Sequence, residues 1–132
     1  MSSESEKTEA NRALAVKFLT LLGNDKMKEA FDMMGDNGVW WTTARTQTPE
    51  QLLTGYEAVR KHLKGPIEIY IDGTTAEGDR VAVEAHSRAE RINGAIYQNH
   101  YHFLFHIRGN QFTEIREHND THHAAQIFGD LA

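Results

Sequence analysis

The sequence contains no cysteine, only 2 prolines among 132 residues, and no long run of apolar residues. The lack of cysteine excludes disulfide frameworks, thiolate metal sites and cysteine nucleophiles, and it leaves the redox compartment open. Because no apolar stretch is long enough to cross a bilayer, we expect no membrane partner. The polar first residues lack the basic start and the apolar stretch of a signal peptide, so a cytoplasmic location is the default expectation.

Positive charge is also scarce, since 14 basic residues stand against 19 acidic ones and the net charge is -5. This balance gives no electrostatic attraction to nucleic acid or to an anionic membrane. A hydrophobic fraction of 39% and the absence of repeats fit one domain over residues 1–132 that buries its own core. We therefore expect a small hydrophobic molecule or a protein as the partner.

Helical periodicity dominates the first half of the chain. Apolar residues recur at helical spacing over residues 1–23, where Ser3 and Glu6 form a capping-box pattern. A second helix is predicted from Asp25 to Gly35, followed by a strand at 39–42 and a loop at 43–49. A short third helix is predicted to begin at the capping-box pattern of Thr54 and Glu57 and to end before Gly65 and Pro66.

From Ile67 onward apolar and polar residues alternate, which is typical of strands with one buried face. Asn93-Gly94 and Gly109-Asn110 are turn signals, because these residue types tolerate positive φ. The predicted strands are 67–72, 80–92, 95–108 and 111–119, with a short terminal helix at 122–128. Helices followed by an antiparallel meander indicate an α+β fold in which the helices cover one face of the sheet.

The hairpin at Asn93-Gly94 predicts which side chains share a face. A two-residue loop pairs Ile92 with Ala95, and this pair fixes the cross-strand partner of every other residue in the two strands. One face then carries most of the large aromatic residues, so we assign it to the helix-covered interior. Buried ionisable groups on that face require partners or a ligand pocket. This predicted inner face comprises Glu84, His86, Arg88, Tyr97, Asn99, Tyr101, Phe103 and Phe105.

The second hairpin leaves one alternative open. A regular turn at Gly109-Asn110 places Asp120 opposite Asn99 and His118 opposite Tyr101, whereas a bulge would bring Glu117 to the inner face instead of His118. Trp40 and Trp41 are adjacent on the predicted strand, so only one of them faces the pocket.

The predicted outer face carries Val83, Leu104 and several histidines. Alternating strand residues lie far apart, which disfavours a metal site among these histidines. An exposed apolar sheet face favours a two-fold homodimer contact instead.

Four segments of the second half of the chain, 81–85, 93–94, 97–105 and 116–121, form a recognisable pattern when taken in that order. This pattern resembles the SnoaL-like and ketosteroid-isomerase-like branch of the nuclear transport factor two superfamily. The resemblance implies a cone-shaped, cystatin-like α+β barrel, with three N-terminal helices on a strongly curved sheet around a pocket. It also implies frequent dimers, no cofactor, and activities such as isomerisation, cyclisation, dehydration and epoxide hydrolysis.

The resemblance also suggests roles for single residues. Asp120 stands where relatives among the epoxide hydrolases and polyketide cyclases carry a working aspartate. Glu84 and His86 stand where the epoxide hydrolases carry an Arg-x-Asp pair. Trp40 and Trp41 stand where a ketosteroid isomerase carries its general-base aspartate, so the usual steroid isomerase chemistry is not expected.

Two hypotheses follow from these observations. The first is an enzyme that moves a proton on a hydrophobic oxygenated substrate, with no metal and no cofactor. The second is a non-catalytic ligand-binding or dimerisation module of the same fold, in which Glu84, His86 and Arg88 only neutralise one another. For the enzyme, the candidate catalytic residues are Asp120, His86 and Glu84, and the candidate substrate-binding residues are Asn99, Tyr101, Trp41, Arg88, Phe103 and Glu117.

Overall fold

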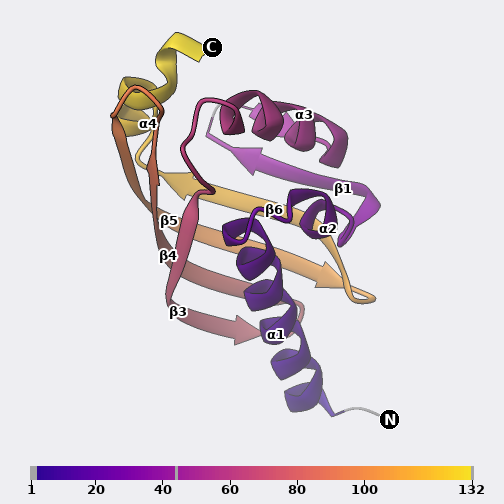
Figure 1. Ribbon diagram of the computed structural model, residues 1–132. Coiled ribbons are helices and arrows are strands. Elements are labelled where there is room, and N and C mark those ends of the chain that lie inside the picture. The colour runs from indigo at the N-terminus through magenta and orange to yellow at the C-terminus, as the bar shows by residue number, and fades with distance from the viewer. Residues whose placement is uncertain (1–2, 44, 132) are drawn as a thin grey trace.

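The computed structural model describes residues 3–43 and 45–131. Figure 1 shows α1, α2 and α3 on one side of a curved sheet, with α4 at one end of it. None of the described helices is both long and apolar enough to cross a membrane. In chain order the elements are α1 (Glu4–Gly23), α2 (Met27–Phe31), β1 (Met34–Thr42), β2 (Arg45–Gln47), α3 (Pro49–Arg60), β3 (Glu68–Glu77), β4 (Arg80–Glu90), β5 (Ile96–Arg108), β6 (Gln111–Asn119), α4 (Thr121–Phe128) and η1 (Gly129–Leu131).

The six strands form one mixed sheet in the order β2-β1-β6-β5-β4-β3. The pair β1 and β6 is parallel, and the other neighbouring pairs are antiparallel. This arrangement confirms the predicted α+β fold of helices packed on a curved sheet. The sheet does not close into a barrel, because β2 and β3 remain as its two edges. Register shifts in the β3–β4, β5–β6 and β1–β6 pairs are irregularities of the kind that bend a sheet.

Helix α1 is held by a cap and by an aromatic core. The Ser3 hydroxyl accepts the backbone N–H of Glu6 at 3.1 Å, as the sequence predicted. Phe18 is fully buried between this helix and the sheet. Its ring centroid lies 5.0 Å from that of Phe112 and 5.7 Å from that of Phe105, both in edge-on arrangements. These contacts fix α1 across the inner face of the sheet.

Three boundaries in the first half differ from the sequence prediction. Helix α2 begins after Lys26 because Asp25 adopts a left-handed φ of 66°. Strand β1 starts at Met34, five residues before the predicted strand, and β2 occupies part of the predicted loop. Helix α3 begins at Pro49 behind a capping box of Thr48 and Gln51, rather than at Thr54. A proline is well suited to the first helical position, where its missing N–H is not needed.

The β4–β5 hairpin has a three-residue loop where a two-residue loop was predicted. The N–H of Arg91 donates to the carbonyl of Ala95, and the N–H of Gly94 donates to the carbonyl of Arg91, both at 2.8 Å. Gly94 takes the positive φ, at 92°. The observed register of β4 and β5 therefore differs by one residue from the predicted register. As a result, each side chain of β4 lies on the opposite face of the sheet from the one predicted, when the face of β5 is kept fixed.

This shift corrects the predicted faces of β4. Val81, Val83 and Ala85 are buried on the inner face, whereas Glu84 and Arg88 are exposed and His86 is half-exposed on the outer face. The prediction for β5 is confirmed, because its aromatic face lies under the helices and contributes to the core. That face carries Tyr97, Asn99, Tyr101, Phe103 and Phe105.

Candidate functional site

A cavity of about 320 Å³ lies between the inner face of the sheet and helices α2 and α3. This volume is within the range of small-molecule sites, and most of its wall is apolar. The polar wall residues come from strands and from α3, and they include one carboxylate and one guanidinium among the described residues. The wall consists of Leu22, Met27, Phe31, Trp40, Thr42, Arg45, Gln47, Leu52, Gly55, Tyr56, Val59, Ile67, Ile69, Tyr97, Tyr101, Phe103, Glu117 and Phe128.

A bulge decides that Glu117, and not His118, faces the cavity. The β5–β6 register shifts between His106 and Ile107, so that Phe103 pairs with Glu117 and His102 pairs with His118. Residues directly opposite in an antiparallel pair share a face. Glu117 therefore joins Phe103 on the inner face, and His118 is exposed on the outer face. This is the second of the two alternatives left open by the sequence.

The Glu117 carboxylate is held by two neutral donors. The indole N–H of Trp40 donates to Oε1 at 2.9 Å, and the amide of Asn119 donates to Oε2. No cation forms an ion pair with Glu117 among residues 3–43 and 45–131. Burial raises the pKa of Glu117 above its ordinary value, and the two hydrogen bonds only partly offset this effect. Glu117 is thus a carboxyl group with a raised pKa in an apolar wall.

Tyr101 belongs to a chain of hydroxyl groups at the same cavity. Its oxygen lies 2.8 Å from Oγ of Ser87 and 2.9 Å from the hydroxyl of Tyr97, and Asn99 Nδ2 donates to that second hydroxyl at 2.9 Å. Burial raises the pKa of both tyrosines. Both hydroxyl groups are therefore protonated near neutral pH and available as hydrogen-bond donors.

Asn99 joins β5 to the start of α4 instead of lining the cavity. Its side chain is 1% exposed, and its amide donates to the carbonyl of Asp120 at 3.1 Å while its oxygen accepts the N–H of Asp120 at 2.9 Å. The carboxylate of Asp120 is exposed and caps α4 by accepting the N–H of His123 at 3.0 Å. Asp120 is hydrogen-bonded to Asn99, but the predicted register is wrong, because Tyr101 lies opposite Asn119 rather than His118. Neither Asp120 nor Asn99 belongs to the cavity wall.

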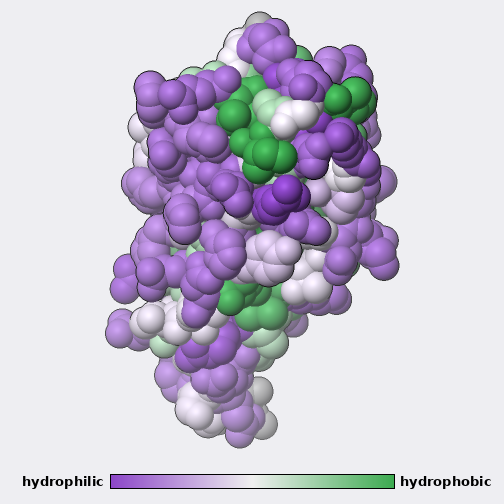
Figure 2. Space-filling view, turned by 60° about the vertical axis from the view of Figure 1, so that its left-hand side comes forward, coloured by the Kyte–Doolittle hydropathy of each residue, from purple (hydrophilic) through white to green (hydrophobic). Residues whose placement is uncertain are grey.

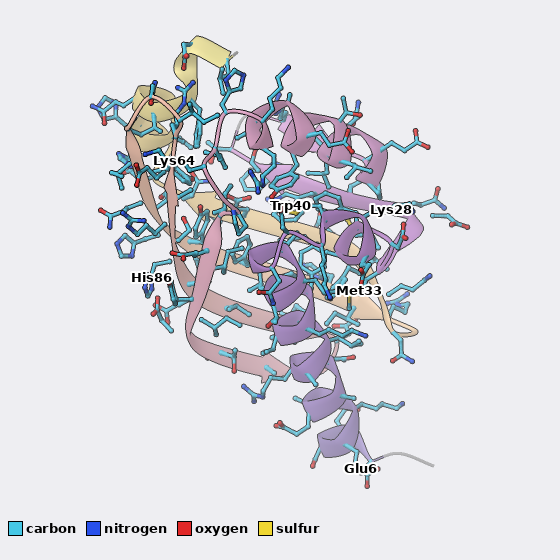
Figure 3. The ribbon with its side chains drawn as sticks, viewed as in Figure 1. Glu6, Lys28, Met33, Trp40, Lys64 and His86 are labelled. Carbon is cyan, nitrogen blue, oxygen red and sulfur yellow. The ribbon has the colours of Figure 1, made fainter. Side chains whose placement is uncertain are left out.

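The three ionisable residues predicted on the inner face of β4 lie outside the cavity. His86 Nδ1 is 2.8 Å from the carboxylate of Asp72, and its ring stacks on Tyr70 with centroids 5.0 Å apart. Figure 3 shows His86 at the left of the view, well apart from Trp40. The prediction that Glu84, His86 and Arg88 line the pocket is wrong, because it depended on the two-residue loop.

Trp40 occupies the inner position that was assigned to Trp41. Trp40 is 7% exposed, and its ring lies against Phe103 at 6.0 Å between centroids. Trp41 is on the outer face, where the guanidinium of Arg116 lies 4.1 Å from its ring centroid. Phe103 and Tyr101 line the cavity as predicted.

Sequence reasoning missed the polar groups on β2 and α3. Arg45 and Gln47 lie in a segment predicted to be a loop, and three residues are too few to show the alternation of a strand. Tyr56 lines the cavity and donates a short hydrogen bond to Asp25. Asp25 also forms an ion pair with Arg60 at 3.0 Å. This cluster ties α3 to the turn before α2.

Figure 2 shows a largely hydrophilic face with a hydrophobic area at the level of α3 and α4. Among the described residues, no three side chains of histidine, aspartate or glutamate are grouped closely enough to hold a metal ion.

Comparison with known proteins gives a family and a set of similar folds. The model of the SnoaL-like domain family matches residues 15–115. Solved structures of the same fold include PrhC from Penicillium brasilianum, with a TM-score of 0.84, 16% identity, and 94% of this chain and 89% of that chain covered. AclR from Streptomyces galilaeus has a TM-score of 0.80, 13% identity, and coverage of 95% and 99%. TerC, co-crystallised with polyporic acid, has a TM-score of 0.77, 13% identity, and coverage of 90% and 98%. No curated protein matched the chain.

Proposed function

Because the chain belongs to the SnoaL-like domain family, whose model spans most of it, we propose that it binds an apolar, oxygenated small molecule in the cavity and moves a proton on it. The observation that supports this proposal is the Glu117 carboxylate, which lies in an apolar wall with a raised pKa and no cationic partner among the described residues. A base whose pKa is raised toward neutrality is better matched to proton transfer at physiological pH.

Glu117 and Tyr101 have different roles in the proposed reaction. Glu117 takes a proton from the carbon next to a ligand carbonyl, and the electrons of that C–H bond form the double bond of an enolate. The Tyr101 hydroxyl donates to the enolate oxygen, and the Tyr97 hydroxyl, 2.9 Å from the Tyr101 oxygen, supports it through their shared hydrogen bond. Return of the proton from Glu117 to the same carbon or to a conjugated carbon restores the carboxylate. No cofactor takes part in this sequence of steps.

The similar structures support the ligand class, although their identity to this chain is low. TerC was co-crystallised with polyporic acid, and the cavity of this chain is walled by aromatic and aliphatic side chains with a few convergent hydroxyl groups. Such a wall favours a ring compound that carries oxygen at one side.

The test measures proton exchange on a cyclic ketone, β-tetralone, in deuterium oxide by proton NMR. The wild-type protein is expected to accelerate exchange of the protons next to the carbonyl above the buffer rate. Glu117→Gln keeps the shape of the side chain but removes the base, so it should return exchange to the buffer rate while ketone binding persists. Binding without any acceleration by the wild type would reject catalysis and leave a ligand-binding module.

We also propose that the outer face of the sheet forms a homodimer contact. Leu104 lies half-buried in the middle of that face, opposite Ala82 on β4 and Arg116 on β6, and Tyr70 is 46% exposed at its edge. An apolar area within a mixed charged face is typical of a subunit contact. Val83 does not take part, because it is fully buried on the inner face.

A further inference from the structure

Arg45 is placed on the cavity wall by the register of the edge strand β2. Gln47 pairs with Trp40 and Thr46 pairs with Trp41 in the antiparallel β1–β2 ladder. Because opposite residues share a face, Gln47 lies on the inner side with Trp40. Arg45 is two residues away and therefore lies on the same side, and both residues belong to the cavity wall.

The Arg45 guanidinium has no counter-ion in the described part of the chain. Among those residues it forms no ion pair, and it is the single cation of the cavity wall. Arg60 pairs with Asp25 and Arg91 pairs with Asp130. Among the described residues the exposed Arg88 on the outer face of β4 also forms no ion pair, but it does not belong to the cavity wall. Arg45 is exposed on the edge strand, so its guanidinium lies at the solvent-facing rim of the cavity. A guanidinium without a counter-ion at this rim is suited to a planar, negatively charged group, because its donors form a fork.

We propose that Arg45 binds an acidic group of the ligand, so that the cavity takes an apolar ring compound with a carboxylate, sulfonate or ionised enol at its β2 side. This inference rests on the proposed function and specifies the substrate class of the same cavity. Arg45 and Thr42 stand on the edge pair β1–β2, whereas Tyr101 stands on β5, two strands beyond β1 in the sheet. A ligand that spans the cavity thus meets a cation at one side and the hydroxyl chain at the other.

Two fluorescent probes with the same ring system separate charge recognition from apolar binding. Anilinonaphthalene sulfonate carries an acidic group, and N-phenylnaphthylamine is its neutral counterpart. Arg45→Gln is expected to weaken binding of the sulfonate about tenfold, since it removes a charge-assisted hydrogen bond, and to leave binding of the neutral probe unchanged. Added salt should weaken only the sulfonate, and only in the wild type.

Two further variants test whether the fluorescent probes bind in the cavity. Gly55 lies on α3 at the exposed rim of the cavity, and a Cβ there would meet nothing within 4 Å. Gly55→Phe is therefore expected to obstruct the cavity entrance and to weaken binding of both probes without a loss of fold. Arg108→Gln removes an exposed charge elsewhere on the sheet and should change neither affinity.

The outcomes distinguish this inference from the proposed function. Equal weakening of both probes by Arg45→Gln, or no weakening of the sulfonate, overturns the role of Arg45 and leaves the proposed function standing. If neither probe binds the wild type, or if Gly55→Phe leaves both affinities intact, the cavity is not the binding site and both proposals fall.

Discussion

The indole nitrogen of Trp40 lies 2.9 Å from Oε1 of Glu117, and this hydrogen bond connects β1 to β6 inside the cavity wall. The Trp40 ring is itself fixed by aromatic neighbours, with centroids 5.7 Å from Phe18 and 6.3 Å from Phe31. The orientation of the Glu117 carboxylate is therefore set by the packed core. A carboxylate held in this way is pre-organised for the proton transfer that we propose.

The raised pKa of Glu117 makes stability depend on pH in a defined direction. Because the folded protein favours the protonated carboxyl, Glu117 contributes stability below its unfolded pKa of about 4.3. That contribution is lost as the pH rises through the higher folded pKa. Thermal unfolding from pH 4 to 8 should therefore show wild-type stability falling relative to Glu117→Gln. The exposed control Glu57→Gln should follow the wild type. Parallel pH profiles of wild type and Glu117→Gln would contradict the raised pKa.

Periodicity predicted the elements of this fold better than it predicted their registers. The Ser3 cap and the apolar spacing of α1 were readable, and β6 has the predicted bounds of Gln111–Asn119. The β4–β5 register was not readable, because Asn93 and Gly94 fit both a two-residue and a three-residue loop. A difference of one residue in that loop exchanges the faces of β4. It is therefore the reason why Glu84, His86 and Arg88 were misplaced.

The candidate site was predictable only in part, for similar reasons. Tyr101 and Phe103 were predicted correctly, because the aromatic residues of β5 all lie on one face and therefore indicate the buried side. The sequence offered Glu117 and His118 as alternatives, since a bulge leaves no clear sequence signal. Arg45 was not considered at all, because a three-residue edge strand is too short to show alternation.

The proposed homodimer predicts a monomeric variant. Leu104→Glu places a charge in the middle of the outer face, beside Arg116 and opposite Ala82, without touching the inner core. Sedimentation at micromolar concentrations should give a dimer for the wild type and a monomer for Leu104→Glu, with cavity binding retained. The exposed control Gln98→Glu, nearer the hairpin end of β5, should remain dimeric. A wild type that sediments as a monomer throughout this range rejects the contact.

Variants of Asn99 and Asp120 should differ in their effect on stability, although both residues lie at the junction of β5 and α4. The buried Asn99 oxygen accepts the N–H groups of His100 and Asp120, and its amide donates to Tyr97 and to the Asp120 carbonyl. Asn99→Ala leaves several of these groups without partners, so urea unfolding should show a loss of about 2–4 kcal/mol. Asp120→Ala removes only a helix cap and should cost about 1 kcal/mol, whereas Asp120→Asn retains the cap and should be nearly neutral.

Proton exchange on β-tetralone then decides whether Asp120 takes part in the reaction. The Asp120 carboxylate is exposed, is engaged with the N–H of His123, and does not belong to the cavity wall. Asp120→Asn should therefore retain the exchange rate of the wild type, in contrast to Glu117→Gln. The alternative expectation from the family resemblance is that Asp120 carries out the proton transfer. If Asp120→Asn keeps its stability but loses exchange, the carboxylate must reach the ligand, and the reaction centre belongs at the start of α4 rather than at Glu117.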